Sequence, residues 1–461
     1  MWAVGSIDRL AGLTGQGSRA ARIGSRCMAP GVNKDPSVHP SSAERKGHRV
    51  KTRLAAALVA LGLPSCQQDR DQAGAPAAET SGDAGAQSVG VQAADYPLEV
   101  WGDLPVSEAW DSAGIRIVEN ASPEEGSRLH WEIGPEPDVT IGDIDGEDPY
   151  LLSYAWDATR LSDGRIVVAD RSTSELRVFD ATGAYLTKWG GEGEGPGEFP
   201  WMSLGDVEPW PGDSIVAWYS DAQTISVFDS EGNFGRSFNR AGAGQRPWEV
   251  ARPELVRRDG SILAVLEQGE NAGTAEVRIL NGEGGLHMSL GHHASRRALY
   301  FSRELKLGLW GDLAVVSTNH KYELRAFAAD GTLVRIVRRG HVPRVPRAED
   351  IMVDPRLRPE LRIPMEAEMR KVPQSRLEEY FPAFAEIMSD AAGYLWVREY
   401  EPPKEAGPAL VWTVFSPEGR VLGFVETPAG LKVYEIGEDY LLGHAEGELD
   451  VEMIQVWPLR R

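Results

Sequence analysis

The sequence predicts an all-β protein, a six-bladed β-propeller whose last blade is closed by a strand from the N-terminal side. Three observations carry this prediction. A degenerate turn-and-strand repeat recurs with anchors at residues 179, 228, 279 and 327, so its period is near 50 residues. Short strands repeated at this period are typical of propeller blades. The 50 glycines and 30 prolines suit a chain rich in turns. A spare strand also precedes the first blade.

Five blades follow from the repeat with little adjustment. The clearest copy, residues 154–190, is blade one. The strands expected in the next four blades are 212–218 and 225–229; 259–266 and 276–280; 311–317, 323–327 and 333–337; and 393–398, 411–415 and 421–425. Blade six has only 431–434, 439–443 and 451–457 before the chain ends. Because it lacks one strand, we expect residues 137–142 to complete it and remove the free edge of the ring.

A segment at about residues 340–390 interrupts the repeat. The interval from anchor 327 to anchor 415 is 88 residues, about 40 more than the period. Segments 348–352, 364–370 and 375–380 lie between prolines and are expected to form short helices. A long excursion on one face of a propeller can be a lid or docking element, or a structural cap.

The N-terminal region has the pattern of an export signal. Residues 46–53 are basic, residues 54–65 are apolar and small, and Cys66 follows at once. This order is typical of a secretory signal, and twelve apolar residues are too few for a permanent membrane span. Residues 63–66 resemble a bacterial lipobox, which implies lipid attachment at Cys66 and an anchor in the bilayer. Gln67 rather than Asp at the next position favours the outer membrane over the inner one.

Two further segments flank this signal. Residues 1–49 lie upstream of a complete signal, and our hypothesis is that the true start is near Val50. Residues 67–97 are rich in Ala, Gly, Gln, Ser and Asp, so with Cys66 they are expected to form a disordered tether. The domain organisation is therefore a signal region (1–65), a lipidated Cys and tether (66–97), and the propeller (98–461).

The charge of the chain excludes one class of partner. The formal net charge is −21, although the first 65 residues are basic. The remainder is strongly acidic and repels phosphate backbones, so no nucleic-acid partner is expected.

Three segments carry a family resemblance: residues 110–120, 190–199 and 393–400. They resemble the bacterial six-bladed β-propeller lipoproteins, near the NHL-repeat and TolB-like propellers, over about residues 100–461. The resemblance implies the fold and little about activity. Blade three departs from the pattern, because Asn281 stands where other blades carry an acid, and its turn is expected to differ.

Equivalent positions of the blades carry acidic residues. Nine positions before the first apolar residue of each second strand stand Asp157, Asp206, Pro253 (followed by Glu254), Glu304, Glu386 and Lys432. Equivalent places in a ring converge on one axis, so Asp157, Asp206, Glu304 and Glu386 are candidate ligands for a central Ca²⁺. The alternative is that these acids are solvated or paired with Arg160, Arg252 and Arg303.

Other motifs add little chemistry. Tyr154, Trp156 and Trp201 lie near the expected channel mouth and are candidates for stacking on a sugar or peptide. The glycine-rich residues 190–197 contain three glutamates and precede no helix, so a phosphate loop is not expected there. The sequence contains no serine-hydrolase or Walker motif.

The function these patterns favour is that of a membrane-anchored module of the cell envelope, placed in the periplasm or outside. It would bind or scaffold a peptide, protein or glycan at one propeller face. The alternative is a Ca²⁺-dependent hydrolase of the lactonase type that uses the channel acids. A third possibility is a purely structural envelope component.

Overall fold

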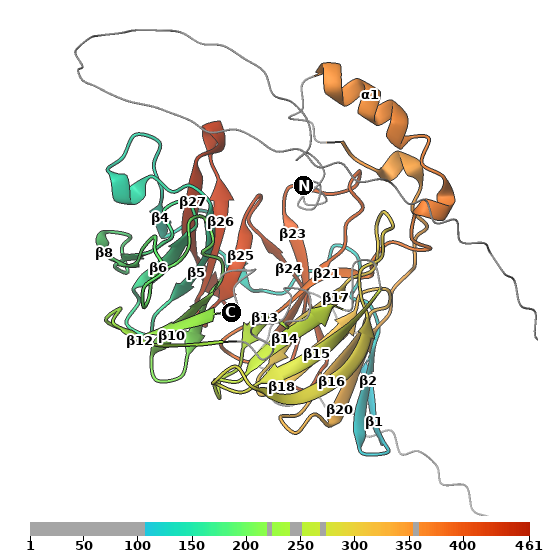
Figure 1. Cartoon of the computed structure of the whole chain (residues 1–461). Helices are drawn as coiled ribbons and strands as arrows, with labels where there is room; N and C mark the ends of the chain where they lie inside the picture. Colours follow the sequence, from blue (N-terminus) through green and yellow to red (C-terminus); the bar gives the residue numbers. More distant parts are fainter. Residues whose placement is uncertain (1–106, 219–223, 240–250, 268–272, 354–358) are drawn as a thin grey trace, which may run out of the picture. The chain divides into compact units, whose positions relative to one another are not determined.

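A computed structural model describes residues 107–461 apart from 219–223, 240–250, 268–272 and 354–358. The described residues belong to one unit of the chain. They form six mostly antiparallel sheets arranged in a ring, which confirms the predicted six-bladed propeller (Figure 1). The signal region, Cys66 and the tether fall outside the described residues and stay predictions. No helix of the described part is long and apolar enough to span a membrane.

The first three blades are four-stranded meanders in chain order from the centre outward. Blade one contains β5 (Ala155–Arg160), β6 (Ile166–Asp170), β7 (Glu175–Phe179) and β8 (Tyr185–Gly190). Blade two contains β9 (Val207–Trp210), β10 (Ser214–Trp218), β11 (Thr224–Phe228) and β12 (Phe234–Asn239). Blade three contains β13 (Arg252–Val256), β14 (Ile262–Glu267), β15 (Thr274–Leu280) and β16 (Leu286–Ala294).

The last three blades follow the same order and then close the ring. Blade four contains β17 (Leu305–Trp310), β18 (Leu313–Thr318), β19 (Glu323–Phe327) and β20 (Leu333–Arg339). Blade five contains β21 (Phe384–Ser389), β22 (Leu395–Glu399), β23 (Leu410–Phe415) and β24 (Val421–Thr427). Blade six contains β25 (Lys432–Ile436), β26 (Tyr440–Glu446), β27 (Glu452–Arg460), β3 (Glu132–Ile133) and β4 (Val139–Ile141).

The closing strand is the one expected from the sequence. Strand β4 pairs antiparallel with β27, with Ile141 opposite Ile454 and Val139 opposite Val456. The chain therefore joins its N-terminal side to its last strand within one blade. This pairing covers the outer edge of β27, as the missing-strand argument predicted.

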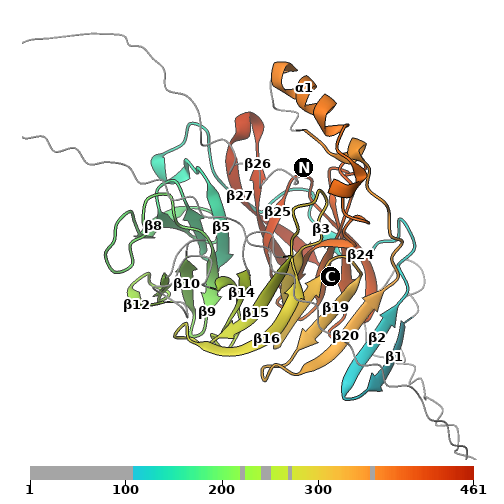
Figure 2. The ribbon, with the colours of Figure 1, turned by 45° about the vertical axis from the view of Figure 1, so that its right-hand side comes forward.

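One addition to blade four was not expected. Strands β1 (Ser107–Ser112) and β2 (Ile115–Asn120) form a hairpin, and β2 pairs parallel with β20 so that blade four has six strands (Figure 2). Asn120 holds the hairpin in place, because its amide donates to the carbonyls of Arg338 and Gly419, both at 3.0 Å.

The recurrent outer turn explains the repeated acid and glycine. In blade one the carboxylate of Asp180 accepts the N–H of Ala184 at 2.9 Å. The Asn281 amide oxygen accepts the N–H of Gly285 at 2.9 Å in the same way, so the expectation of a different turn in blade three is wrong. An amide oxygen and a carboxylate oxygen serve equally as the acceptor in such a turn. The turn glycine Gly183 has φ +86° and lies against Val139 of β4, so it also lets blade one approach blade six.

The hydrophobic core is divided among the interfaces between blades. Six clusters of buried residues lie one at each interface, including the one between blades six and one that contains Ile141, Phe179 and Ile454. The largest fully buried side chains include Trp218, Trp396 and Trp412. Because each blade is covered on both faces, its middle strands are apolar at nearly every position.

The insertion between β20 and β21 is helical, as predicted, although its helices have other bounds. Helix α1 spans Pro359–Met369 and passes through Pro364, whereas a helix over 364–370 was expected. Single 3₁₀ turns occupy Ala348–Asp350 and Gln374–Arg376. Proline suits the first position of a helix, which favours a start at Pro359. Helix α1 buries none of its residues.

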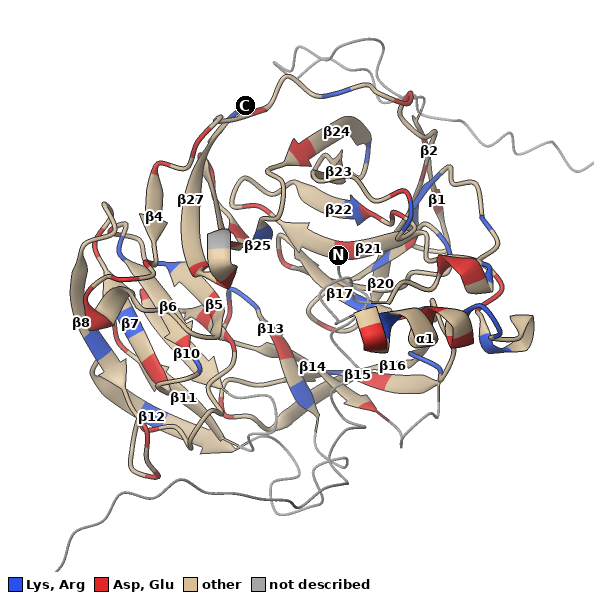
Figure 3. Ribbon diagram, turned by 90° about the horizontal axis from the view of Figure 1, so that it is seen from above, with Lys and Arg blue, Asp and Glu red and all other residues tan. Residues whose placement is uncertain are grey.

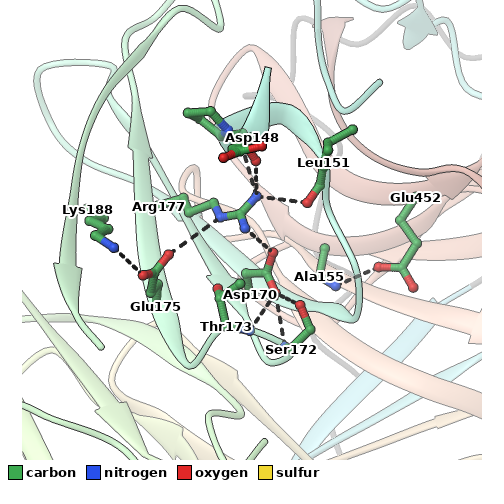
Figure 4. Close-up of polar contacts among 11 residues, drawn as sticks. Asp148, Leu151, Ala155, Asp170, Ser172, Thr173, Glu175, Arg177, Lys188 and Glu452 are labelled. Carbon is green, nitrogen blue, oxygen red and sulfur yellow. Dashed lines mark hydrogen bonds and ion pairs between the residues drawn. The ribbon is translucent and has the colours of Figure 1, made fainter. Parts of the chain in front are cut away.

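A buried ionic cluster fixes the chain segment that enters blade one (Figure 4). The guanidinium of Arg177 donates to the carbonyls of Asp148, Pro149 and Leu151 at 2.9–3.2 Å. It also lies 3.1 Å from the carboxylate of the fully buried Asp170. We call Arg177, Asp170 and these carbonyls the Arg177 cluster. Its opposite charges face each other inside the fold.

Candidate functional site

A cavity of about 550 Å³ lies at the centre of the ring. Its wall includes residues of or next to the innermost strand of every blade, namely β5, β9, β13, β17, β21 and β25 (Figure 3). We call it the central cavity. Its size is within the usual range of ligand-binding sites in proteins, about 300–1,000 Å³.

The residues selected from the sequence lie together on this wall. The lining includes all four candidate metal ligands, Asp157, Asp206, Glu304 and Glu386, and it also includes Glu254 and Lys432. Each lies on an inner strand or directly before one. Asp157, Glu386 and Lys432 pair with equivalent residues of their second strands, whereas the shorter turn between β17 and β18 places Glu304 further along its strand, opposite Asn319.

The wall also contains charged residues that the alignment missed. Glu208 is two positions after Asp206 on the same strand face, and the period-two rule for strands could have found it. Glu267 lies at the end of a second strand, β14, where no inner-strand argument applies. Among the described residues, the cavity lining holds seven acidic side chains and four basic ones: Asp157, Asp206, Glu208, Glu254, Glu267, Glu304 and Glu386 against Arg252, Arg296, Lys306 and Lys432.

Two carboxyl groups of neighbouring blades meet in the acidic part of the cavity. Asp157 accepts the backbone N–H of Val207 at 3.0 Å, which places its carboxylate beside Asp206. Burial and the negative charge of Asp206 raise the pKa of Asp157 to about 8. Burial also raises the pKa of Asp206, although a hydrogen bond from Trp156 and the charge of Lys432 oppose that rise. At neutral pH this pair therefore retains a proton.

The adjacent glutamates extend this effect. Burial, followed by the charges of Asp157 and Asp206, raises the pKa of Glu208 well above its usual range. Burial raises the pKa of Glu254 as well, although Arg252 at 2.7 Å works in the opposite direction. These side chains keep some contact with solvent through the cavity. The cavity holds negative charge that the protein itself neutralises only in part.

The other two predicted ligands already face cations. Glu304 lies 2.7 Å from Lys306, and Glu386 lies 3.0 Å from Arg398. Neither partner is one of the arginines expected from the sequence, although Arg252 does pair with Glu254. Within the described residues, no group of three or more His, Cys, Asp or Glu side chains is placed to hold a metal ion. The four acids thus share a cavity without forming a calcium cage, and calcium binding stays a prediction that this arrangement does not favour.

The three candidate aromatics are exposed. The side chains of Tyr154, Trp156 and Trp201 are 55%, 40% and 68% exposed. Trp156 lines the cavity itself. The guanidinium of Arg171 lies 4.7 Å from the centre of the Trp156 ring, and its Nε donates to the carbonyl of Met202, next to Trp201, at 2.8 Å. Arg171 thus connects Trp156 with the backbone beside Trp201, whereas Tyr154 and Trp201 are not among the residues that line the cavity.

Comparison with known proteins agrees with the fold and adds no activity. Residues 155–208 match the DUF5128 family model, described as a 6-bladed beta-propeller. No curated protein sequence matches the chain.

Several solved structures are similar at low identity. A member of the DUF4221 family from Bacteroides vulgatus is 10% identical with a TM-score of 0.45, over 72% of this chain and 99% of that one. A protein from Bacteroides fragilis proposed to be exported is 11% identical with a TM-score of 0.44, over 75% and 99%. A calcium-binding protein, regucalcin, from Agrobacterium tumefaciens is 10% identical with a TM-score of 0.35, over 70% and 92%.

Proposed function

We propose that this chain is a lipid-anchored binding module of the cell envelope, and that its central cavity receives a positively charged group of a peptide, protein or glycan ligand. The observation that supports the ligand's charge is the excess of carboxylates in the cavity, with the Asp157–Asp206 pair at its acidic end. A cation placed there would offset the burial of both carboxylates and the charge of Asp206 that helps to raise the pKa of Asp157. The export signal at residues 46–66 supports the location.

The scaffold suits binding more directly than catalysis. Most of the cavity wall comes from the strands of the six blades, so most of the charged groups are held by the packed core. Charge complementarity of this kind fixes the orientation of a ligand and rejects partners of the wrong sign. We therefore expect selectivity for cations over neutral or anionic analogues of the same size.

Calorimetric titration of the purified full-length chain with spermidine tests this proposal. We expect saturable binding that weakens about tenfold in Asp157→Asn and in Asp206→Asn, because each removes one carboxylate from the cavity. Glu231→Gln is the matched control, since it removes the same charge from an exposed turn of blade two and should leave the affinity unchanged. Equal affinity in all four proteins would contradict the proposal.

The anchor needs its own test. Cells that produce the chain are labelled with radioactive palmitate, and we expect label in the wild type and none in Cys66→Ser. Label that persists in Cys66→Ser would show that the lipid, if any, is attached elsewhere.

A further inference from the structure

Three exposed aromatic residues lie near Arg171, and one of them, Trp156, lines the cavity; we call Tyr154, Trp156 and Trp201 the aromatic platform. Arg171 connects them, because its backbone N–H donates to the carbonyl of Tyr154 at 3.0 Å and its side chain contacts Trp156 and the carbonyl of Met202. Monomeric proteins seldom expose several large aromatic side chains together, and such groups mark interaction sites.

The backbone that presents Tyr154 is strained. Its φ is +59°, in the left-handed region that a bulky residue rarely adopts. The carboxylate of Glu452 accepts the N–H of Ala155 at 2.6 Å (Figure 4). It also accepts a hydrogen bond from the backbone of Tyr154. Although burial works in the other direction, hydrogen bonds from His444 and Ala155 hold the pKa of Glu452 below its ordinary value, so this anchor is ionised at neutral pH. The strain is thus fixed from both sides of Tyr154.

The turn that presents Trp201 is fixed in a similar way. The next residue, Met202, has φ +52°. Its N–H donates to the hydroxyl of Ser174 at 3.1 Å, and that hydroxyl donates in turn to the carbonyl of Pro200, also at 3.1 Å. Ser174 is completely buried and itself has a positive φ, +55°. Two strained turns therefore hold two exposed aromatic rings in place, a form of preorganisation that reduces the entropy lost on binding.

The platform continues into the cavity through Trp156. This residue lines the cavity, and its indole N–H is hydrogen-bonded to Asp206. Tyr154 precedes Asp157 by three residues, so in extended chain the platform and the carboxyl pair are about 10 Å apart. A ligand of two or three residues is long enough to touch both.

We propose that the ligand is a peptide in which a lysine or arginine side chain enters the central cavity and an adjacent aromatic residue packs on the aromatic platform. The inference rests on the proposed function and specifies its ligand. Charge complementarity selects the cationic side chain, and the exposed tryptophan and tyrosine supply the apolar contact typical of peptide and protein interfaces. Stacking of a sugar is less suited to Trp156, because Arg171 and Lys432 already lie within 6 Å of its ring centre.

The test compares two blocked tripeptides, Gly-Lys-Phe and Gly-Lys-Gly, and spermidine, each titrated into the full-length chain by calorimetry. We expect the Phe peptide to bind about tenfold more tightly than the Gly peptide. In Trp201→Ala and in Tyr154→Ala this preference should disappear, while the affinity for spermidine stays the same. Tyr380→Ala is the matched control, because Tyr380 is also an exposed aromatic residue, at 40%, but belongs to the insertion. Circular dichroism confirms that each variant is folded.

The outcomes separate the two proposals. If spermidine binds but the Phe and Gly peptides are equivalent, the aromatic platform is not part of the site and the proposed function survives. If no cationic probe binds, both proposals fail. A glucosamine oligosaccharide is titrated as a further probe. If its binding depends on Trp201 while peptide binding does not, the ligand is a glycan and the peptide assignment is overturned.

Discussion

The Arg177 cluster and the central cavity both place charged groups inside the propeller, but they do so in opposite ways. In the Arg177 cluster a guanidinium meets a carboxylate at 3.1 Å and three backbone carbonyls. In the cavity Asp157 lies beside another carboxyl group, Asp206, and its pKa is raised to about 8. The first arrangement neutralises its charge within the protein. The second leaves it to be neutralised by a proton or by something that enters.

This difference teaches which charges belong to the fold and which to the function. A sequence selected only for stability has little reason to place two carboxyl groups side by side in a partly enclosed cavity. Neighbouring carboxyl groups that repel each other are expected at functional sites. Strained backbone positions such as Tyr154 are expected there as well. Asp157 and Tyr154 lie three residues apart in the chain, which is why we place the site there.

The largest expected effect is a loss of stability when the Arg177 cluster is disrupted. Arg177→Met should lower the free energy of unfolding by about 3–5 kcal/mol, because it leaves Asp170 buried without a counter-charge. Urea denaturation at pH 7 measures this.

The chain provides a matched control for that substitution. Residues 323–327 repeat the pattern of residues 175–179, and Arg325 occupies the place of Arg177. The Arg325 side chain is half exposed and pairs with Glu323 at 2.8 Å. Arg325→Met should therefore cost about 1 kcal/mol or less. If both substitutions lowered the free energy of unfolding equally, the burial of the Arg177 cluster would not add to stability.

A smaller effect is expected in the central cavity, where the contribution of Asp157 to the free energy of unfolding depends on pH. Asp157 ionises near pH 4 when unfolded and near pH 8 when folded, so the folded state holds one more proton between these values. Its contribution to stability is present below pH 4 and is lost as the pH rises through 8. Asp157→Asn cannot ionise. Between pH 6 and pH 9 the wild type should lose about 1 kcal/mol more than Asp157→Asn, a figure reduced from the maximum because the cavity admits solvent.

Thermal melts of both proteins across this pH range measure the difference. Glu208 and Lys432 are present in both proteins, whereas Asp206 loses its titrating neighbour in the variant, so the difference reports the Asp157–Asp206 pair. Parallel pH profiles would show that Asp157 is ionised at neutral pH and that the cavity is not strained by like charges.

The smallest effect is expected from calcium. Glu304 and Glu386 already face Lys306 and Arg398, so we expect Ca²⁺ and a chelator to leave the melting temperature unchanged. A ligand at about 100 times its dissociation constant would stabilise the protein by about 2.7 kcal/mol, which a melt detects readily. A Ca²⁺-dependent rise that is lost in both Glu304→Gln and Asp206→Asn would restore the calcium site and the hydrolase alternative.

The fold could be predicted where the signal is local or periodic. The turn residues Asp180 and Gly183 recur with the blades, and the spare strand at 137–142 followed from counting. The β1–β2 hairpin could not be found this way, because its parallel pairing with β20 joins segments far apart in the sequence and follows no repeat. The interior Pro364 hid the start of α1, since proline usually marks a helix boundary.

The site could be predicted in position but not in chemistry. Alignment of the blades placed Asp157, Asp206, Glu304 and Glu386 in one cavity, although Glu304 does not occupy the equivalent place on its strand. The alignment could not show that Lys306 and Arg398 face two of the four acids, because rotamers decide which neighbour a long side chain reaches. Nor could it show the hydrogen bonds that hold Tyr154 and Met202 in strained conformations.

The pairing of β4 with β27 also sets the order in which the protein can be completed during synthesis. Residues 139–141 leave the ribosome before any blade exists, yet their partners, residues 454–456, are made only after the strands of the first five blades. Contacts so distant along the chain form late, and until then both strand edges stay open to other chains. A ribosome that stops early would therefore release a ring with an unclosed last blade, and such products are expected to aggregate rather than persist as shorter propellers.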